Sequence, residues 1–134
     1  MARLSSFTFG TTLPGSIAEV RPRVEAALKA EGFGVLTEID VKATLKAKLD
    51  VDRTPMVILG ACNPRLANAA IDADASVGAL LPCNVVLREQ EGGTLVEIID
   101  PLMMLGVLDS PAVQPVADEA RERLDRVVSS LTAD

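Results

Sequence analysis

The 134-residue sequence contains no histidine, tryptophan or tyrosine, and it has only three phenylalanines and two cysteines. Because histidine is absent, neither a Cys–His nor a Ser–His nucleophile can be assembled from this chain. Two cysteines are also too few for a closed tetrahedral zinc site within one chain, although two chains could supply four thiolates across a dimer axis. The scarcity of aromatic rings removes the stacking surfaces that bind single-stranded nucleic acid.

The chain is also short of positive charge, with 13 basic against 19 acidic residues and a net charge of −6. An acidic domain repels phosphate backbones, so we expect no nucleic-acid partner. No apolar run approaches the length of a membrane span, and the first residues lack the apolar core of a signal peptide. We therefore expect no membrane partner, and we expect a cytoplasmic protein whose thiols stay reduced.

Aliphatic residues supply the material for one core, and a chain of this length fits a single domain over residues 1–134. Hydrophobic periodicity and turn residues predict the order β-α-β-α-β-α-β-β-α. From this order we predict an α+β fold with two layers, in which helices pack on one face of a mostly antiparallel five-stranded sheet. The predicted strands cover 4–10, 33–39, 56–61, 85–90 and 94–99, and the predicted helices cover 17–31, 41–49, 64–71 and 113–131.

Capping residues mark the ends of the first two predicted helices. Ser16 followed by Glu19 is typical of a capping box at a helix start. Pro22 should interrupt the hydrogen bonds of that helix and kink it, and Gly32 should end it in a left-handed conformation. Asp40 is expected to cap the second helix, which is too short to be stable unless its apolar stripe leans on the sheet. The stripe consists of Val41, Leu45 and Leu49.

The two cysteines occur in similar segments, LGACNP and LLPCNV. The first segment ends a continuous apolar run, which favours a strand buried on both faces. Asn63 and Pro64 then predict a helix start, with asparagine as the N-cap and proline at the first helical position. Because a helix N-terminus favours a thiolate, the pKa of Cys62 is expected to fall below that of a free thiol. A small buried residue beside a turn is an equally plain explanation of Cys62.

The second cysteine, Cys83, follows Pro82 at the start of a predicted strand, and no helix begins after it. The chain between the two cysteines holds a helix and a return loop, which is long enough to bring both strand ends to one side of the sheet. Soft sulfur ligands would suit copper(I), and Met56, Met103 and Met104 could add thioethers to the thiols. Methionine in such apolar surroundings is nevertheless more typical of a core.

Several segments in combination resemble a known family. They are EGFGV at 31–35, IDV at 39–41, LGACNP at 59–64, LLPCNVV at 80–86, and Asp100–Pro101 with the methionines that follow. Together they are similar to the domain of unknown function 302, and the resemblance covers nearly the whole chain. It implies a compact α+β domain that commonly forms homodimers, and it implies no established activity. Both cysteines fall on the two cysteines of the family pattern.

We interpret the sequence as a homodimeric module that binds a small molecule or a partner and that needs no cofactor and no metal. The two Cys–Asn segments would line its pocket, and the candidate binding residues are Cys62, Asn63, Pro64, Pro82, Cys83, Asn84 and Asp100. The alternative is a thiol-dependent redox, sulfur-transfer or soft-metal-binding protein in which Cys62 and Cys83 are the working thiols. A third interpretation gives both cysteines a purely structural role. The positions and exposure of the two sulfur atoms separate these interpretations.

Overall fold

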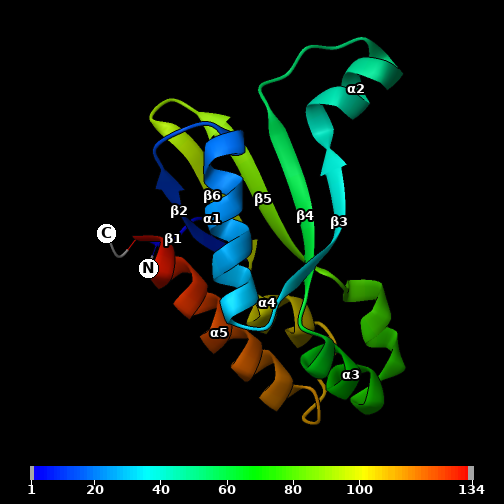
Figure 1. The fold of residues 1–134 in the computed structure, drawn as a ribbon. Helices are drawn as coiled ribbons and strands as arrows, with labels where there is room; N and C mark the ends of the chain where they lie inside the picture. The colour runs from blue at the N-terminus through cyan, green and yellow to red at the C-terminus, as the bar shows by residue number, and fades with distance from the viewer. Residues whose placement is uncertain (1, 133–134) are drawn as a thin grey trace.

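The structure, a computed structural model, describes residues 2–132 and is an α+β fold, as predicted (Figure 1). The strands of these residues form one antiparallel sheet in the order β1-β2-β6-β5-β4-β3. All five predicted strands are present, and the structure adds the two-residue strand β1. The strands are β1 (Ala2–Arg3), β2 (Thr8–Leu13), β3 (Gly34–Asp40), β4 (Met56–Cys62), β5 (Cys83–Gln90) and β6 (Gly93–Ile99). The helices are α1 (Ile17–Ala30), α2 (Val41–Leu49), α3 (Pro64–Ala73), α4 (Pro101–Gly106) and α5 (Gln114–Thr132), with a 3₁₀ helix η1 (Ala75–Leu80).

The main core lies between one face of the sheet and the helices α1 and α5, which gives the predicted two layers (Figure 1). Phe9, Leu59 and Ile98 from the sheet are almost completely buried there. They pack in one cluster with Leu28 of α1 and Leu124 of α5. Each such side chain contributes roughly 1.5–3 kcal/mol when it is removed from water. The core is aliphatic because the sequence has few aromatic rings to place in it.

The other face of the sheet is only partly shielded, which corrects the prediction that 56–61 is buried on both faces. Leu59 and Ala61 of β4 point into the core and are fully buried, whereas Ile58, which precedes Leu59, and Val86, which pairs with Ile58, are half-buried. Asn84 on the neighbouring strand is exposed. An antiparallel sheet can be buried on one face only, so a continuous apolar run in a strand does not by itself require burial of both faces.

The first long strand begins later than predicted, at Thr8 rather than at residue 4. The Ser5 hydroxyl hydrogen-bonds to the Thr8 hydroxyl at 2.6 Å and accepts a hydrogen bond from the Phe7 amide at 3.3 Å. The Leu4 amide donates to the Thr8 carbonyl at 3.0 Å. Serine therefore closes a tight turn within the segment predicted as a strand, because its hydroxyl offers the backbone a local partner.

The signals at the ends of α1 are confirmed. The Ser16 side chain accepts a hydrogen bond from the Glu19 amide, and the Glu19 side chain accepts one from the Ser16 amide. The helix continues on both sides of Pro22 as one element. Gly32 has a φ of +85°, which places it in the left-handed region, and its amide donates to the Lys29 carbonyl at the helix end. Glycine adopts this conformation without the steric cost that other residues meet.

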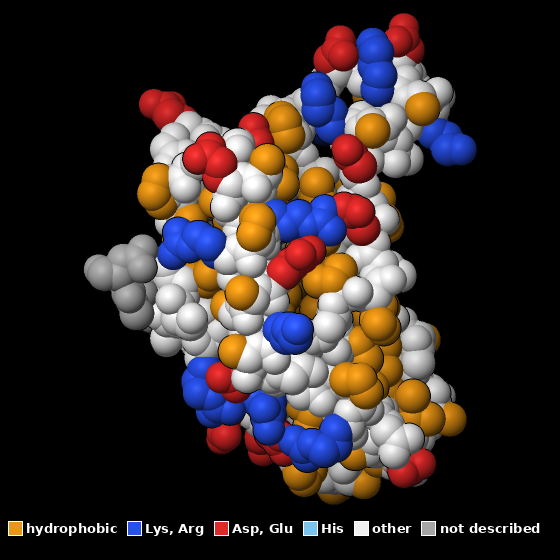
Figure 2. All heavy atoms as spheres, in the orientation of Figure 1, with side chains coloured by type: hydrophobic (Ala, Val, Ile, Leu, Met, Phe, Trp, Pro, Cys, Tyr) orange, Lys and Arg blue, Asp and Glu red, His pale blue; other side chains and the backbone are white. Residues whose placement is uncertain are grey.

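Helix α2 contacts the sheet only weakly, through its first turns, where Val41 and Leu45 are half-buried. Asp40 caps it as expected, by accepting a hydrogen bond from the Ala43 amide at 2.9 Å, and Asp50 ends it with a φ of 56°. None of its residues is buried, and Leu49 is 66% exposed. The helix extends beyond the far ends of β3 and β4, and Figure 2 shows it as a separate lobe that carries basic and acidic side chains. Its apolar stripe therefore has no full partner within the described part of the chain.

A second, smaller core lies at the opposite end of the sheet, where α3, η1, α4 and the start of α5 meet. Its buried members are Ala70, Val77, Leu105, Val113 and Ala117. Neither η1 nor α4 was among the predicted helices. Within residues 2–132, no helix combines the length and the apolar character needed to cross a membrane.

We expect the substitution Gly32→Val to lower the free energy of unfolding by about 1 kcal/mol or more, because valine would have to adopt a strained positive φ. A Cβ at this position would also lie 2.8 Å from the Asn63 side-chain nitrogen. Gly34→Val is the matched control, since Gly34 has no atom within 4 Å of an added Cβ and no left-handed φ. Urea unfolding of the three proteins measures the effect. Equal losses for the two variants would contradict this account of Gly32.

Candidate functional site

Both cysteines line one small cavity, which we call the thiol cavity. It lies where the ends of β4 and β5 meet α3, α4 and α5, and its volume is about 30 Å³. Ala61 pairs with Cys83 across the two strands, so Cys62 is the next residue along from that pair. The cavity is lined by Phe33, Ala61, Cys62, Asn63, Leu66, Ala67, Ala70, Leu81, Cys83, Pro101, Met104, Leu105, Val116 and Ala120. The fold therefore brings the two strand ends together on one side of the sheet.

The two thiols are free and differ in their surroundings. Cys62 is half-buried and Cys83 is buried. Burial raises the pKa of the Cys62 thiol, and burial together with the nearby charge of Cys62 raises the pKa of Cys83 to about 11. Both side chains are therefore thiols, and not thiolates, at neutral pH.

The expectation of a lowered pKa at Cys62 is accordingly wrong. Cys62 stands one residue before the N-cap of α3, so the side chain that receives the helix amide is that of Asn63. The electrostatic benefit of a helix start declines within its first turn, and it is roughly 0.3–1 kcal/mol at an exposed end. Desolvation of the thiolate outweighs a benefit of that size at this half-buried position.

Asn63 holds the cavity together through its side-chain amide. Its Oδ1 accepts a hydrogen bond from the Leu66 amide at 3.2 Å, and its Nδ2 donates a longer one, at 3.4 Å, to the Glu31 carbonyl. Pro64 occupies the first turn of α3, as predicted. Both polar ends of the Asn63 amide are engaged by the backbone, so this residue lines the cavity as a structural cap.

The second Cys–Asn segment does not repeat the first, although the sequence analysis placed both in one pocket. Asn84 is exposed on the open face of the sheet, opposite Gly60 of β4. Pro82 packs on Gly60, where an added Cβ would lie 2.8 Å from the Pro82 ring. The difference arises because the chain leaves a strand at Asn63 and stays in a strand at Asn84, where successive side chains alternate between faces.

Asp100 lies outside the thiol cavity and joins three parts of the chain. Its carboxylate, with 1% of the side chain exposed, accepts hydrogen bonds from Arg3 and Arg121, each at 2.7 Å, and from the Leu102 amide at 2.9 Å. The Arg121 guanidinium also lies 4.5 Å from the centre of the Phe9 ring. Burial alone would raise the pKa of Asp100, but the hydrogen bonds and the charges of the two arginines outweigh it and lower the pKa. The carboxylate therefore anchors β1, α4 and α5 and is not free for a ligand.

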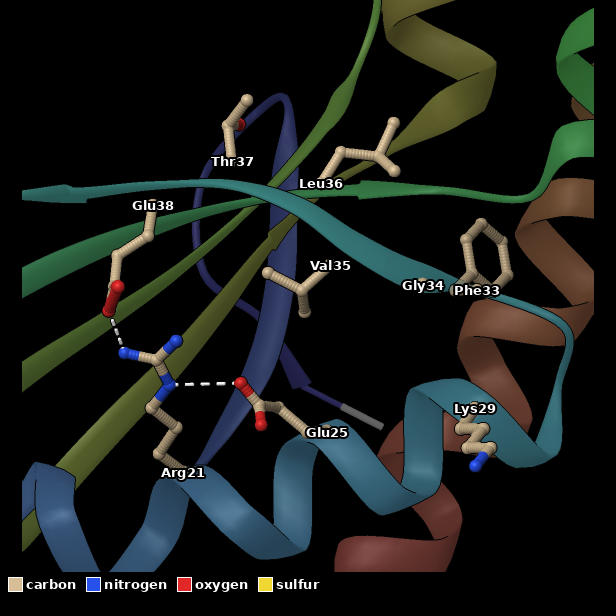
Figure 3. Close-up of a pocket in the computed structure, with 9 residues that line it drawn as sticks. All are labelled: Arg21, Glu25, Lys29, Phe33, Gly34, Val35, Leu36, Thr37 and Glu38. Atoms are coloured by element: carbon tan, nitrogen blue, oxygen red, sulfur yellow. Dashed lines mark hydrogen bonds and ion pairs between the residues drawn. The ribbon is translucent and has the colours of Figure 1, made fainter.

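An open groove between α1 and β3, with a volume of about 570 Å³, was not predicted (Figure 3). Arg21 lies at one end and pairs with Glu25 at 2.9 Å and with Glu38. The hydrogen bonds to the two carboxylates, that to Glu38 first, raise the pKa of Arg21. Lys29 and Phe33 lie at the other end (Figure 3). Only the spacing of Arg21 and Glu25 signals any of this in the sequence, because Glu38 reaches the helix through the fold.

Sulfur supplies the donors that could hold a metal in the thiol cavity. Met104 of α4 lines it together with the two cysteines, whereas Met103 is 49% exposed and Met56 lies at the other end of the sheet. Within residues 2–132, no site gathers three or more Cys, Asp or Glu side chains in a metal-holding group. All three methionines were candidate ligands from the sequence, and only the fold separates Met104, which lines the cavity, from the other two.

Comparison with known proteins gives one consistent result. The sequence profile of the family described as Domain of unknown function DUF302 matches residues 9–131. The crystal structure of an uncharacterized conserved DUF302 protein from Bacillus stearothermophilus is similar to this structure with a TM-score of 0.86. The two sequences are 33% identical over 94% of this chain and 98% of that chain. No curated protein matches this sequence.

We expect Asp100→Asn to lower the free energy of unfolding by about 2 kcal/mol at neutral pH, because it leaves two arginines without their buried partner while asparagine can still cap α4. The pKa of Asp100 is lowered in the folded protein. Its contribution is therefore present above the ordinary aspartate pKa and is lost as the pH falls through the folded value.

Urea unfolding across the acid range measures the contribution of Asp100 to the free energy of unfolding. The wild-type protein should lose more stability than Asp100→Asn on going from about pH 6 to about pH 3, so the two curves should converge. Asp72→Asn, at an exposed position of α3, should follow the wild type. Parallel curves for the wild type and Asp100→Asn would show that the carboxylate does not have this role.

Proposed function

This chain belongs to the DUF302 family, and we propose that it is a binding module that holds a very small ligand in the thiol cavity. The observation that carries the proposal is the placement of two free thiols in one apolar cavity beside three helices. Pockets for drug-sized ligands have volumes of about 300–1,000 Å³. A cavity of about 30 Å³ has room for an atom or a few atoms only.

Thiol catalysis is the less well supported alternative. A nucleophilic cysteine needs a lowered pKa or a neighbouring general base. Here the pKa values of both Cys62 and Cys83 are raised, and the described residues that line the cavity include no acid and no base. The amide of Asn63 is engaged by the backbone. These properties favour ligand binding over nucleophilic catalysis. Free thiols also fit the reducing environment of the cytoplasm.

We also propose that the module acts as a homodimer, through a surface made of β3 and α2. The sheet has two edges, and the β1 edge is blunted because that strand has two residues. The β3 edge is seven residues long and exposes Leu36 and Ile39. A nine-residue helix without buried residues is marginal by itself in water. A long exposed edge beside an unsupported helix favours a partner that covers both.

Charge supports a second copy of the chain as that partner. The segment 41–53 carries four basic and two acidic residues, so its charge is +2. The whole chain carries −6, which leaves −8 on the remainder. The α2 lobe of one chain would therefore be attracted to the acidic body of another, and the same contact would occur twice about a two-fold axis.

The alkylation rates of the two thiols distinguish a binding module from a thiol enzyme. Alkylation of the folded protein with iodoacetamide, followed by mass spectrometry of each cysteine, should show Cys62 reacting first. Its rate should stay low at neutral pH and rise only in alkaline solution, because burial raises its pKa above that of a free thiol. Cys83 should need a pH near 11 or unfolding. The urea-unfolded protein is the control, in which both should react alike. Rapid alkylation of either folded thiol at pH 7 would favour the thiol enzyme instead.

The dimer is tested by light scattering at micromolar concentration. The wild type should have twice the chain mass of 14.1 kDa, and Leu49→Glu on α2 should weaken association by at least about tenfold because it places a charge in the apolar contact. Ile71→Glu on α3, at a comparably exposed position outside the proposed surface, should have no effect. A monomeric wild type, or dissociation by Ile71→Glu alone, would reject this interface.

A further inference from the structure

Three sulfur-bearing side chains from separate parts of the sequence line the thiol cavity. Cys62 ends β4, Cys83 begins β5 and Met104 lies in α4. Their neighbours around the cavity are apolar, apart from the Asn63 amide that the backbone occupies. Among the side chains of the described residues that line the cavity, two thiols and a thioether are the soft donors for a metal. Such a set is selective, because thiolate and thioether ligands prefer soft ions.

We propose that the thiol cavity binds one soft monovalent metal ion of the copper(I) class, held by the sulfur atoms of Cys62, Cys83 and Met104. This inference rests on the proposed function, since it names the class of ligand that the module takes. The cavity, at about 30 Å³, has room for a single ion without its water shell. An ion that keeps oxygen ligands or water, such as Mg²⁺ or Ca²⁺, has no suitable partner in this cavity.

Binding releases protons, because a thiol must lose its proton to coordinate the ion. One copper(I) ion and two thiols give a complex with two Cu–S(thiolate) bonds and two protons released to water, with no electron transferred. The Met104 thioether donates a lone pair and loses no proton. The complex carries one negative charge, which is smaller than that of two free thiolates and is easier to keep in an apolar cavity.

The surroundings of the two thiols provide a route for the ion. Cys62 is half-buried and therefore reaches solvent, whereas Cys83 is buried. Met104 is half-buried, and methionine adjusts its three rotatable bonds readily. An ion can therefore meet the partly exposed residues Cys62 and Met104 first and then the buried Cys83. Zinc is disfavoured, because it takes four ligands in closed protein sites and the cavity offers three.

Silver(I) serves as the probe, because it is soft, monovalent and stable in air. Titration of the wild-type protein should give one ion per chain, and silver(I) should protect both cysteines from iodoacetamide near pH 11, where both thiols of the metal-free protein react. Met104→Leu should weaken silver(I) binding by at least about tenfold, since it removes one ligand while keeping an apolar side chain of similar volume. Met103→Leu is the matched control, because Met103 lies one position away on α4 and is 49% exposed. Zinc(II) at the same concentration should protect neither thiol.

Equal silver(I) affinities for Met104→Leu and the wild type would overturn the three-sulfur site, and so would a stoichiometry of two or more ions at equal affinity. Cys62→Ser and Cys83→Ala should each abolish protection of the remaining thiol, and their circular dichroism shows whether they fold. If silver(I) leaves both thiols open to alkylation while their rates still rise only in alkaline solution, the soft-ion proposal fails and the binding module stands. Rapid alkylation at pH 7 in the absence of silver would instead reject the binding module.

Discussion

The side-chain amide of Asn63 joins the elements that surround the thiol cavity, and the geometry of the site depends on this junction. The amide caps α3 through the Leu66 amide and reaches the Glu31 carbonyl at the end of α1. Arg123 of α5 donates to the same carbonyl at 3.2 Å. Gly32 makes the approach possible, because a side chain there would press on the Asn63 amide. The end of β4, and with it Cys62, is thereby held against three helices.

The parts of this junction that depend on local chemistry could be predicted from the sequence. The capping box of Ser16, the left-handed Gly32 and the Asn63–Pro64 helix start each depend on interactions within a few residues, and the structure confirms them. The α+β class followed in the same way, from the order of periodic segments. The extra hydrogen bond from Asn63 to Glu31 spans 32 positions, and no local signal announces a contact at that separation.

The predictions that were wrong concern which face of a helix or strand packs against the rest of the chain. Asn84 follows a cysteine, as Asn63 does, yet it lies on the open face because β5 continues past it. The stripe of α2 has helical spacing and still finds no buried position. Asp100 binds Arg3 from the start of the chain and Arg121 from the last helix, and these residues are far apart in sequence. Periodicity identifies an apolar face, but only the tertiary fold determines whether that face meets its own chain, a second copy or solvent.

The two ends of the sheet thus have different characters: one encloses two thiols and a thioether among packed helices, and the other presents an exposed strand and an unsupported helix. The central claim is that the enclosed end is the ligand site. A crystal structure of the silver(I)-loaded protein, with the ion located by its anomalous scattering, tests this most directly. The account predicts one strong peak inside the thiol cavity, within bonding distance of the sulfur atoms of Cys62, Cys83 and Met104. An empty cavity, with silver found only at exposed sulfur such as that of Met103, would contradict it.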